Sequence, residues 1–146
     1  MEVHIYVAQD EKQLTEKERC AGYMIRAEGN PQKVYGVVNV MMTKYQAEIT
    51  AIVDALDRFT RPAQITLHID DWIATNVRDG HLERWHGNGW MTTRGTPVEN
   101  KDYWQRLYNK MRVFKQAGGS FDFARLEEDE ERKVTAYINE KKEQDE

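Results

Sequence analysis

The chain of 146 residues contains one cysteine, three prolines and no long uninterrupted hydrophobic segment. Because the single cysteine, Cys20, cannot form an internal disulfide, the composition indicates a reducing compartment. The apolar segments are too short to span a bilayer, and the N-terminus lacks the pattern of a signal peptide. We therefore expect one cytoplasmic domain over residues 1–142, followed by a frayed acidic end at residues 143–146.

The chain also lacks a positive net charge. Lys and Arg total 21 and Asp and Glu total 25, which gives a net charge of −4 at pH 7. This balance argues against a protein that coats nucleic acid electrostatically, although a protein that contacts a few phosphates remains compatible with it. It also mildly favours a module that binds another protein.

What the chain does contain is a series of strand-like and helix-like segments. Three alternating apolar segments near the N-terminus, separated by polar or turn-forming residues, predict an antiparallel meander. The predicted strands are residues 3–8, 20–27, 33–40, 65–70 and 121–124, and the predicted helices are residues 44–58, 72–77, 101–116 and 127–142. Residues 81–100, which are rich in Gly and Trp, are predicted to form a loop. This order predicts an α/β fold, with helices packed on a mixed five-stranded sheet.

Two acidic residues occupy positions where an acid is costly. Glu48 lies on the flank of an apolar helical stripe, and Asp70 ends a strand that the pattern predicts to be buried. Acids are rarely buried unless they are paired or bind a metal, so these two carboxylates could share a divalent cation. Two structural roles also remain open. Glu48 in the first helical turn would favour the helix dipole, and Asp70 would cap the helix that follows it.

The middle of the chain is similar to the ribonuclease H family. Residues 90–93 and 97–107, with the sequences WMTT and PVENKDYWQRL, resemble the family segment GW…PVKNxDLWxxL. Residues 46–48 (QAE) resemble the helix start N-x-A-E, and residues 69–71 (IDD) resemble the strand end TDS. The resemblance extends from about Val3 to Tyr137. It implies a five-stranded mixed sheet in the order 3-2-1-4-5, in which strand one is antiparallel to strand two and parallel to strand four.

The resemblance implies a metal-dependent reaction. In this family four carboxylates hold two Mg²⁺ ions, which activate a water and stabilise the leaving oxygen as the RNA of an RNA/DNA hybrid is cut. Glu48 and Asp70 match the second and third carboxylates. The resemblance therefore implies that both residues are catalytic and bind metal, either Mg²⁺ or Mn²⁺.

Other residues match positions that contact nucleic acid. Asn100 matches an Asn that contacts the nucleic-acid backbone, and Thr43 matches a Thr of the phosphate pocket. Lys44 and Arg94 are the best candidates for further phosphate contacts. Trp90 could stack on a base or sugar, or pack the short segment that precedes it against the predicted second helix, residues 72–77.

The chain departs from the family pattern at two of the four carboxylates. Ala8 stands where the strand end TDGS places the metal-bridging Asp, and Val134 stands where the last helix places an Asp. The His that normally precedes that helix is also missing. One engineered substitution would explain Ala8 but neither Val134 nor the missing His, so we favour natural loss. Losing the bridging carboxylate should cost several orders of magnitude in rate.

A shifted set of acids would compensate for these losses. Asp10 lies two residues after Ala8 and has the same strand parity. Glu130 and Glu131 precede Val134 by four and three residues on the same helix face. The shifted site would consist of Asp10, Glu48, Asp70 and Glu131. The competing structural roles are a loop acid for Asp10 and helix-start acids for Glu130 and Glu131.

Three functions follow from these observations. The leading hypothesis is a ribonuclease H-like domain that binds an RNA/DNA hybrid or another duplex weakly. Its hydrolytic activity would be lost or strongly reduced, with at most one weak site for Mg²⁺ or Mn²⁺. The alternative is an active divalent-metal ribonuclease H with a rearranged carboxylate site. The third is a protein-interaction module on the same scaffold.

Overall fold

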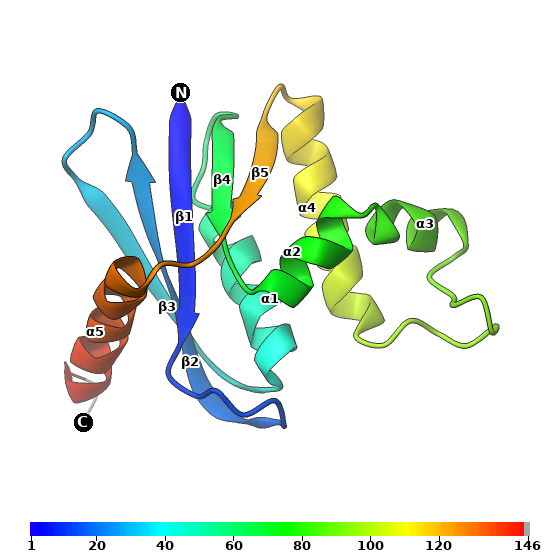
Figure 1. The fold of residues 1–146 in the computed structure, drawn as a ribbon, viewed down its shortest axis with the longest axis horizontal. Helices are drawn as coiled ribbons and strands as arrows, with labels where there is room; N and C mark the ends of the chain where they lie inside the picture. The colour runs from blue at the N-terminus through cyan, green and yellow to red at the C-terminus, as the bar shows by residue number, and fades with distance from the viewer. Residues whose placement is uncertain (145–146) are drawn as a thin grey trace.

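The computed structural model describes residues 1–144 and contains a single sheet flanked by helices (Figure 1). The strands are β1 (Glu2–Gln9), β2 (Lys17–Ala27), β3 (Lys33–Met42), β4 (Gln64–His68) and β5 (Ser120–Ala124). The helices are α1 (Lys44–Leu56), α2 (Asp71–Arg78), α3 (His81–Gly87), α4 (Lys101–Gln116) and α5 (Glu128–Gln144).

The five strands form a mixed sheet in the order β3-β2-β1-β4-β5. Strand β1 pairs antiparallel with β2 and parallel with β4, so the predicted order and directions are confirmed. The hydrophobic alternation predicts the N-terminal meander, and the resemblance to the ribonuclease H family implied the order and directions of all five strands. Because β1 and β4 are parallel, the residues that follow their C-terminal ends lie at the same edge of the sheet.

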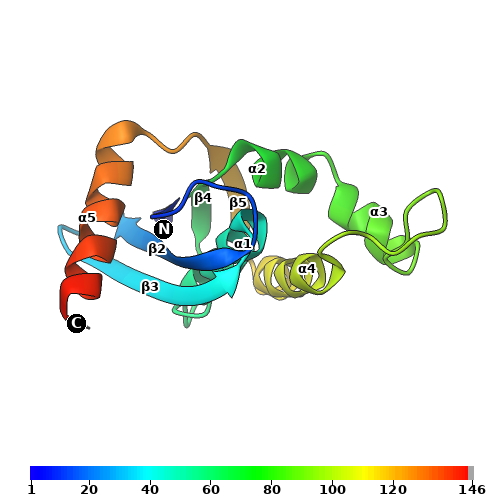
Figure 2. The same cartoon turned by 90° about the horizontal axis from the view of Figure 1, so that it is seen from below.

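Alternation along the strands gives the sheet two covered faces. On one face, Ile5 and Val7 of β1 join the apolar side of α1, and α4 packs outside α1. On the other face, α5 packs against β1 and β2 (Figure 2). Gly22 of β2 permits this close contact, since a Cβ atom there would lie 2.8 Å from Cγ1 of Ile138.

The segment after β4 protrudes from the sheet beside α4, as Figure 1 shows. The predicted loop over residues 81–100 is wrong in part, because α3 occupies its first seven residues. The tryptophans of this segment hold it against α4. Trp85 lies 5.7 Å from Trp104, and Trp90 lies 5.8 Å from Tyr108, measured between ring centroids. Leu82 adds a fully buried side chain to this contact, so α3 is anchored by packing rather than by its own length.

Several predicted boundaries need correction. Strand β2 begins at Lys17 instead of residue 20, and β4 ends at His68, two residues before Asp70. Helix α1 ends at Leu56 instead of residue 58. Helix α5 ends at Gln144, two residues beyond the predicted end at residue 142, and residues 145 and 146 of the expected frayed end lie outside the described residues. Within residues 1–144, no helix is long and apolar enough to cross a membrane.

Candidate active site

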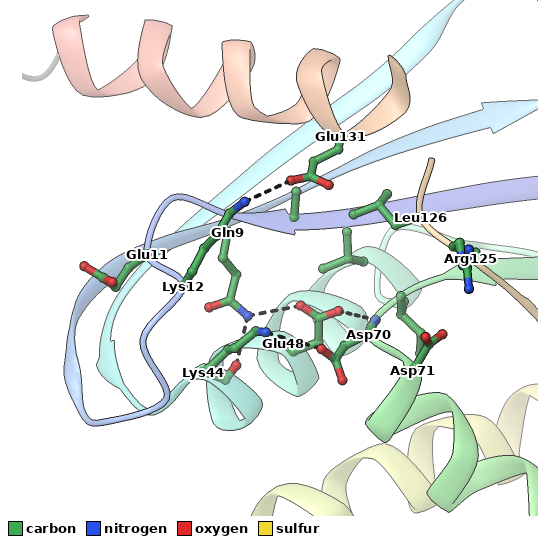
Figure 3. Close-up of a pocket in the computed structure, with 13 residues that line it drawn as sticks. Gln9, Glu11, Lys12, Lys44, Glu48, Asp70, Asp71, Arg125, Leu126 and Glu131 are labelled. Atoms are coloured by element: carbon green, nitrogen blue, oxygen red, sulfur yellow. Dashed lines mark hydrogen bonds and ion pairs between the residues drawn. The ribbon is translucent and has the colours of Figure 1, made fainter. Parts of the chain in front are cut away.

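The C-terminal ends of β1 and β4 and the start of α1 surround a cavity of about 300 Å³ (Figure 3). Both acids singled out in the sequence lie in it, together with cationic and amide side chains. The polar residues that line the cavity are Gln9, Glu11, Lys12, Lys44, Glu48, Asp70, Asp71, Arg125 and Glu131. The cavity therefore combines acids and cations at the sheet edge where open α/β proteins commonly bind ligands.

Glu48 lies in the second turn of α1 and is only 4% exposed. Its Oε1 accepts a hydrogen bond of 3.0 Å from Nε2 of Gln9, and its Oε2 accepts one of 3.0 Å from the backbone N–H of Asp70. Burial raises the pKa of Glu48 to about 7, although both hydrogen bonds act to lower it. Because α1 begins at Lys44, the expected first-turn role of Glu48 is wrong.

Asp70 is the N-cap of α2, which confirms the structural role predicted for it. Its Oδ1 accepts a hydrogen bond of 2.9 Å from the backbone N–H of Trp72. Its Oδ2 lies 3.4 Å from Nζ of Lys44, the first residue of α1. Asp70 therefore caps α2 and also lies next to Glu48, because the end of β4 faces the start of α1.

The donor set does not fit the metal pair of a two-metal nuclease. Each of the four carboxylate oxygens of Glu48 and Asp70 already has a protein N–H or ammonium partner. Mg²⁺ requires near-octahedral oxygen coordination. Even the expected single ion would need Oδ2 of Asp70, so it would have to displace the Lys44 ammonium from that oxygen. Over the described part of the chain, no group of three or more His, Cys, Asp and Glu side chains could hold a metal.

The two positions where the family pattern has further carboxylates are apolar and buried. Ala8 is 5% exposed, and Val134 is fully buried. Both belong to one cluster, in which α5 packs on β1 and β2 through Tyr6, Cys20, Met24 and Ile138. Cys20 is thus a small core residue, as expected. An ionised carboxylate placed at Val134 would lose its hydration without gaining a partner.

Asp10 does not join Glu48 and Asp70. Its Oδ1 accepts a hydrogen bond of 2.8 Å from the backbone N–H of Cys20, and its Oδ2 accepts one of 2.9 Å from Nζ of Lys142. Asp10 therefore pairs with β2 and the end of α5, and the shifted set of four acids is not brought together. Asp10 does not share the strand parity of Ala8, because β1 ends at Gln9 and strand alternation does not extend to Asp10.

The two glutamates of α5 behave differently from each other. Glu130 forms an ion pair of 3.3 Å with Lys133 and is absent from the cavity lining. Glu131 lines the cavity, where its Oε1 lies 3.8 Å from Nζ of Lys12. Of the compensating acids proposed from the sequence, Glu131 alone faces the same cavity as Glu48 and Asp70.

The residues expected to contact nucleic acid differ in accessibility. Thr43 caps α1, and its Oγ1 accepts a hydrogen bond of 3.4 Å from the backbone N–H of Gln46. The Gln46 side chain in turn donates to Oδ1 of Asn100 at 2.9 Å. Trp90 is only 6% exposed, so its ring is not free to stack on a base, and it packs against Tyr108 of α4 rather than against the predicted second helix. Arg94 is exposed in the loop between α3 and α4, where a phosphate can reach it.

Sequence reasoning missed Gln9 and Arg19. Arg19 is 1% exposed, and its Nη1 donates to Oε1 of Gln9 at 3.2 Å, which turns the amide nitrogen of Gln9 toward Glu48. The remaining Arg19 donors bind the backbone carbonyls of Glu11, Gln13, Thr15 and Met42. One signal was available, since Gln9 stands where the pattern TDGS has Gly.

The sheet has the order β3-β2-β1-β4-β5, and Glu48 and Asp70 lie beside the C-terminal ends of its central strands. This arrangement defines an α/β protein of the ribonuclease H-like class. The family model described as RNase H matches residues 5–117, which is more than half of the chain. The chain therefore belongs to the RNase H family.

Curated relatives agree with this assignment. The Ribonuclease H of Hyphomonas neptunium is 35% identical over 89 residues, which cover 59% of this chain and 57% of the relative. The Ribonuclease H of Albidiferax ferrireducens is 40% identical over 65 residues, 44% of each chain. The chain thus spans about half the length of the curated relatives it matches.

Solved structures of the same fold are more distant in sequence. The RNase H1 of Halobacterium salinarum superposes with a TM-score of 0.58 at 16% identity and covers 93% of both chains. LC11-RNase H1, solved in complex with an RNA/DNA hybrid, gives a TM-score of 0.58 at 13% identity and covers 94% of both. At these identities the likeness establishes the fold.

Proposed function

We propose that this chain is an RNase H domain that binds RNA/DNA hybrids while its two-metal hydrolytic activity is lost or strongly reduced. The donor set of the cavity carries the proposal. Glu48 and Asp70 are present, whereas Ala8 and Val134 contribute no oxygen and lie in an apolar cluster. No carboxylate is present to bridge a second divalent ion to the first. Separate ions therefore cannot activate the nucleophile and stabilise the leaving group.

The distribution of charge supports binding to a duplex. Residues 72–117 contain eight Lys and Arg against four Asp and Glu, a net charge of +4, while the rest of the chain carries −8. The exposed cations of this segment are Arg78, Arg84, Arg94, Arg106, Arg112 and Lys115. Cations on one part of a surface supply the sequence-independent attraction to phosphates. A hybrid is the duplex we assign, because the LC11 relative of the same fold was solved with one.

The test measures binding and cleavage of one labelled RNA/DNA hybrid in Mg²⁺ and in Mn²⁺. We expect the parent chain to bind the hybrid and leave it intact in both metals. Ala8→Asp, which adds a carboxylate to the cavity lining, is assayed beside it, and circular dichroism checks that the variant is folded. Cleavage gained by Ala8→Asp would identify the missing bridging carboxylate as the cause of the lost activity. Robust cleavage by the parent chain would refute the loss of activity.

A second function, an active divalent-metal ribonuclease H with a rearranged site, is favoured by Glu131. This acid faces the same cavity as Glu48 and Asp70, and the curated relatives are named Ribonuclease H. Under this function the parent chain cleaves the hybrid, and Glu131→Gln and Glu48→Gln each abolish that cleavage. Glu130→Gln is the matched control, since Glu130 pairs with Lys133 outside the cavity.

A further inference from the structure

We propose that the ammonium group of Lys44 is the resident cation of this cavity, in the place where a two-metal nuclease holds a divalent ion. The group enters from the first turn of α1, and its Nζ lies 3.4 Å from Oδ2 of Asp70. Glu48 follows Lys44 by one helical turn, so both side chains project from the same side of α1. Figure 3 shows Lys44, Glu48 and Asp70 converging on one point of the cavity.

The position of Lys44 follows from the charges around it. Asp70 donates its backbone N–H to Glu48, so two carboxylates are held next to each other at the end of β4. The charge of Asp70 acts to raise the pKa of Glu48, and the charge of Lys44 acts to lower it, so the ammonium group favours the ionised form of both carboxylates. Lys44 is a cation on the chain itself, and its side chain is 28% exposed, so water screens it only partly.

The other cations of the cavity do not perform this role. Lys12 is 84% exposed and its ion pair is with Glu131, on the α5 side of the cavity. Arg125 is exposed and lies on the connection between β5 and α5. Among the cationic side chains that line this cavity, Lys44 therefore makes the ion pair with Asp70.

The remaining carboxylate oxygens are committed to neutral donors. Glu48 accepts from the Gln9 side chain and from the Asp70 backbone, and Oδ1 of Asp70 accepts from the Trp72 backbone. Oδ2 of Asp70 is thus the oxygen that the Lys44 ammonium specifically occupies. A divalent ion entering here would meet a positive charge at close range, and this repulsion excludes it.

The inference concerns the same cavity as the proposed function and rests on it only in that respect. The proposed function follows from carboxylates that are missing, whereas this inference assigns the cation that replaces the metal. It predicts that the folded chain is indifferent to divalent ions, and that removing one ammonium group exposes a latent single-ion site at Glu48 and Asp70.

The experiment measures Mn²⁺ binding to the purified full chain without nucleic acid, by electron paramagnetic resonance of the free ion and by the shift in Tm. The variants are Lys44→Met, which keeps the length and removes the charge, and Lys44→Arg, which keeps the charge. We expect the parent and Lys44→Arg to take up no Mn²⁺ at millimolar concentration. Lys44→Met should bind one ion at least about tenfold more tightly, because the like charge is gone, and its Tm should rise with Mn²⁺.

Two controls locate the effect. Lys12→Met removes the other lysine of the cavity and should behave as the parent does. Adding Asp70→Asn to Lys44→Met should abolish the gained Mn²⁺ binding. Mn²⁺ binding by the parent as tight as that of Lys44→Met, or none by folded Lys44→Met, would overturn the inference. If Lys44→Met does not fold, the parent and Lys44→Arg still decide, since binding of Mn²⁺ by either contradicts a resident cation. Failure of hybrid binding would refute the proposed function and leave this result unchanged.

Discussion

The side-chain amide of Gln9 donates a hydrogen bond of 3.0 Å to the carboxylate of Glu48. The same amide group accepts a hydrogen bond from the buried guanidinium of Arg19 on β2. Glu48 in turn accepts from the backbone of Asp70 at the end of β4. A continuous series of hydrogen bonds therefore connects β2, β1, α1 and the start of α2. These bonds hold the Glu48 carboxylate in one orientation within a buried network.

Replacing Gln9 by Ala should destabilise the fold. The substitution leaves the buried Oε1 of Glu48 and one Arg19 donor without their partner, and an unsatisfied buried polar group costs about 1–3 kcal/mol. Urea denaturation should show a corresponding fall in the free energy of unfolding. Gln116→Ala, at the exposed end of α4, is the matched control and should change stability little. Equal effects of the two substitutions would argue against the network.

The pKa of Glu48 predicts a specific dependence of stability on pH. The carboxyl has an ordinary pKa of 4.5, and burial raises it to about 7 in the folded state. The folded chain therefore retains this proton while the unfolded chain releases it. The contribution of Glu48 to stability is full below pH 4.5 and declines as the pH rises to about 7, by about 3 kcal/mol in all.

The pH profile of Glu48→Gln isolates this contribution. Gln does not titrate, so the free energy of unfolding of the variant minus that of the parent should rise between pH 4.5 and 7 and then level off. Denaturant titrations at intervals of half a pH unit, in buffer without divalent ions, measure this difference. A difference that is constant across the range would show that Glu48 titrates near its ordinary pKa.

The sequence was sufficient to predict the sheet and the proximity of the two acids. Strand alternation fixes which face each residue takes, and the family segment implied that the strands ending near Ala8 and Asp70 are neighbours. The alternation is a periodic pattern and the family segment is contiguous, so both can be recognised in the sequence. The proximity of Glu48 and Asp70 follows from these features, because α1 connects β3 to β4 across the sheet.

The rest of the site depends on contacts between residues far apart in the chain. Asp10 is turned away by Lys142, 132 residues later, and no local pattern carries that information. The burial of Trp90 depends on Tyr108 in α4, and the orientation of Gln9 depends on Arg19. Tertiary contacts of this kind override local propensity and strand parity. The four acids of the shifted site are therefore compatible with the sequence pattern, but the structure does not bring them together.

Two substitutions of Asp70 separate its role as a helix cap from its charge. Asn is as good an N-cap as Asp, so Asp70→Asn should retain the stability of α2 while removing the partner of Lys44. Asp70→Ala removes the cap as well and should cost about 1 kcal/mol more. Thermal unfolding of both variants measures the difference. Equal stability of the Asn and Ala variants would mean that the hydrogen bond to Trp72 contributes nothing.

The packing of α5 on β2 depends on the absence of a side chain at Gly22. A Cβ atom there would lie 2.8 Å from Cγ1 and 2.9 Å from Cδ1 of Ile138. Gly22→Ala should therefore shift α5 and destabilise the fold by about 1–3 kcal/mol, as overpacking does. Gly87→Ala is the control, since no atom lies within 4 Å of its added Cβ. An unchanged Tm for Gly22→Ala would show that α5 adjusts without cost.

Binding of an RNA/DNA hybrid should depend steeply on salt, because exposed arginines rather than the acidic cavity meet the phosphates. Three phosphate contacts would lower the affinity about 40-fold between 50 and 200 mM salt. Arg94→Ala should weaken binding and reduce the slope of log affinity against log salt by about one, since it removes one contact. Arg132→Ala is the matched control, because Arg132 already pairs with Glu128 and Asp129 on α5. Fluorescence anisotropy across this salt range measures both variants. An affinity that barely changes with salt, or the same loss from Arg132→Ala as from Arg94→Ala, would place the duplex elsewhere on the molecule.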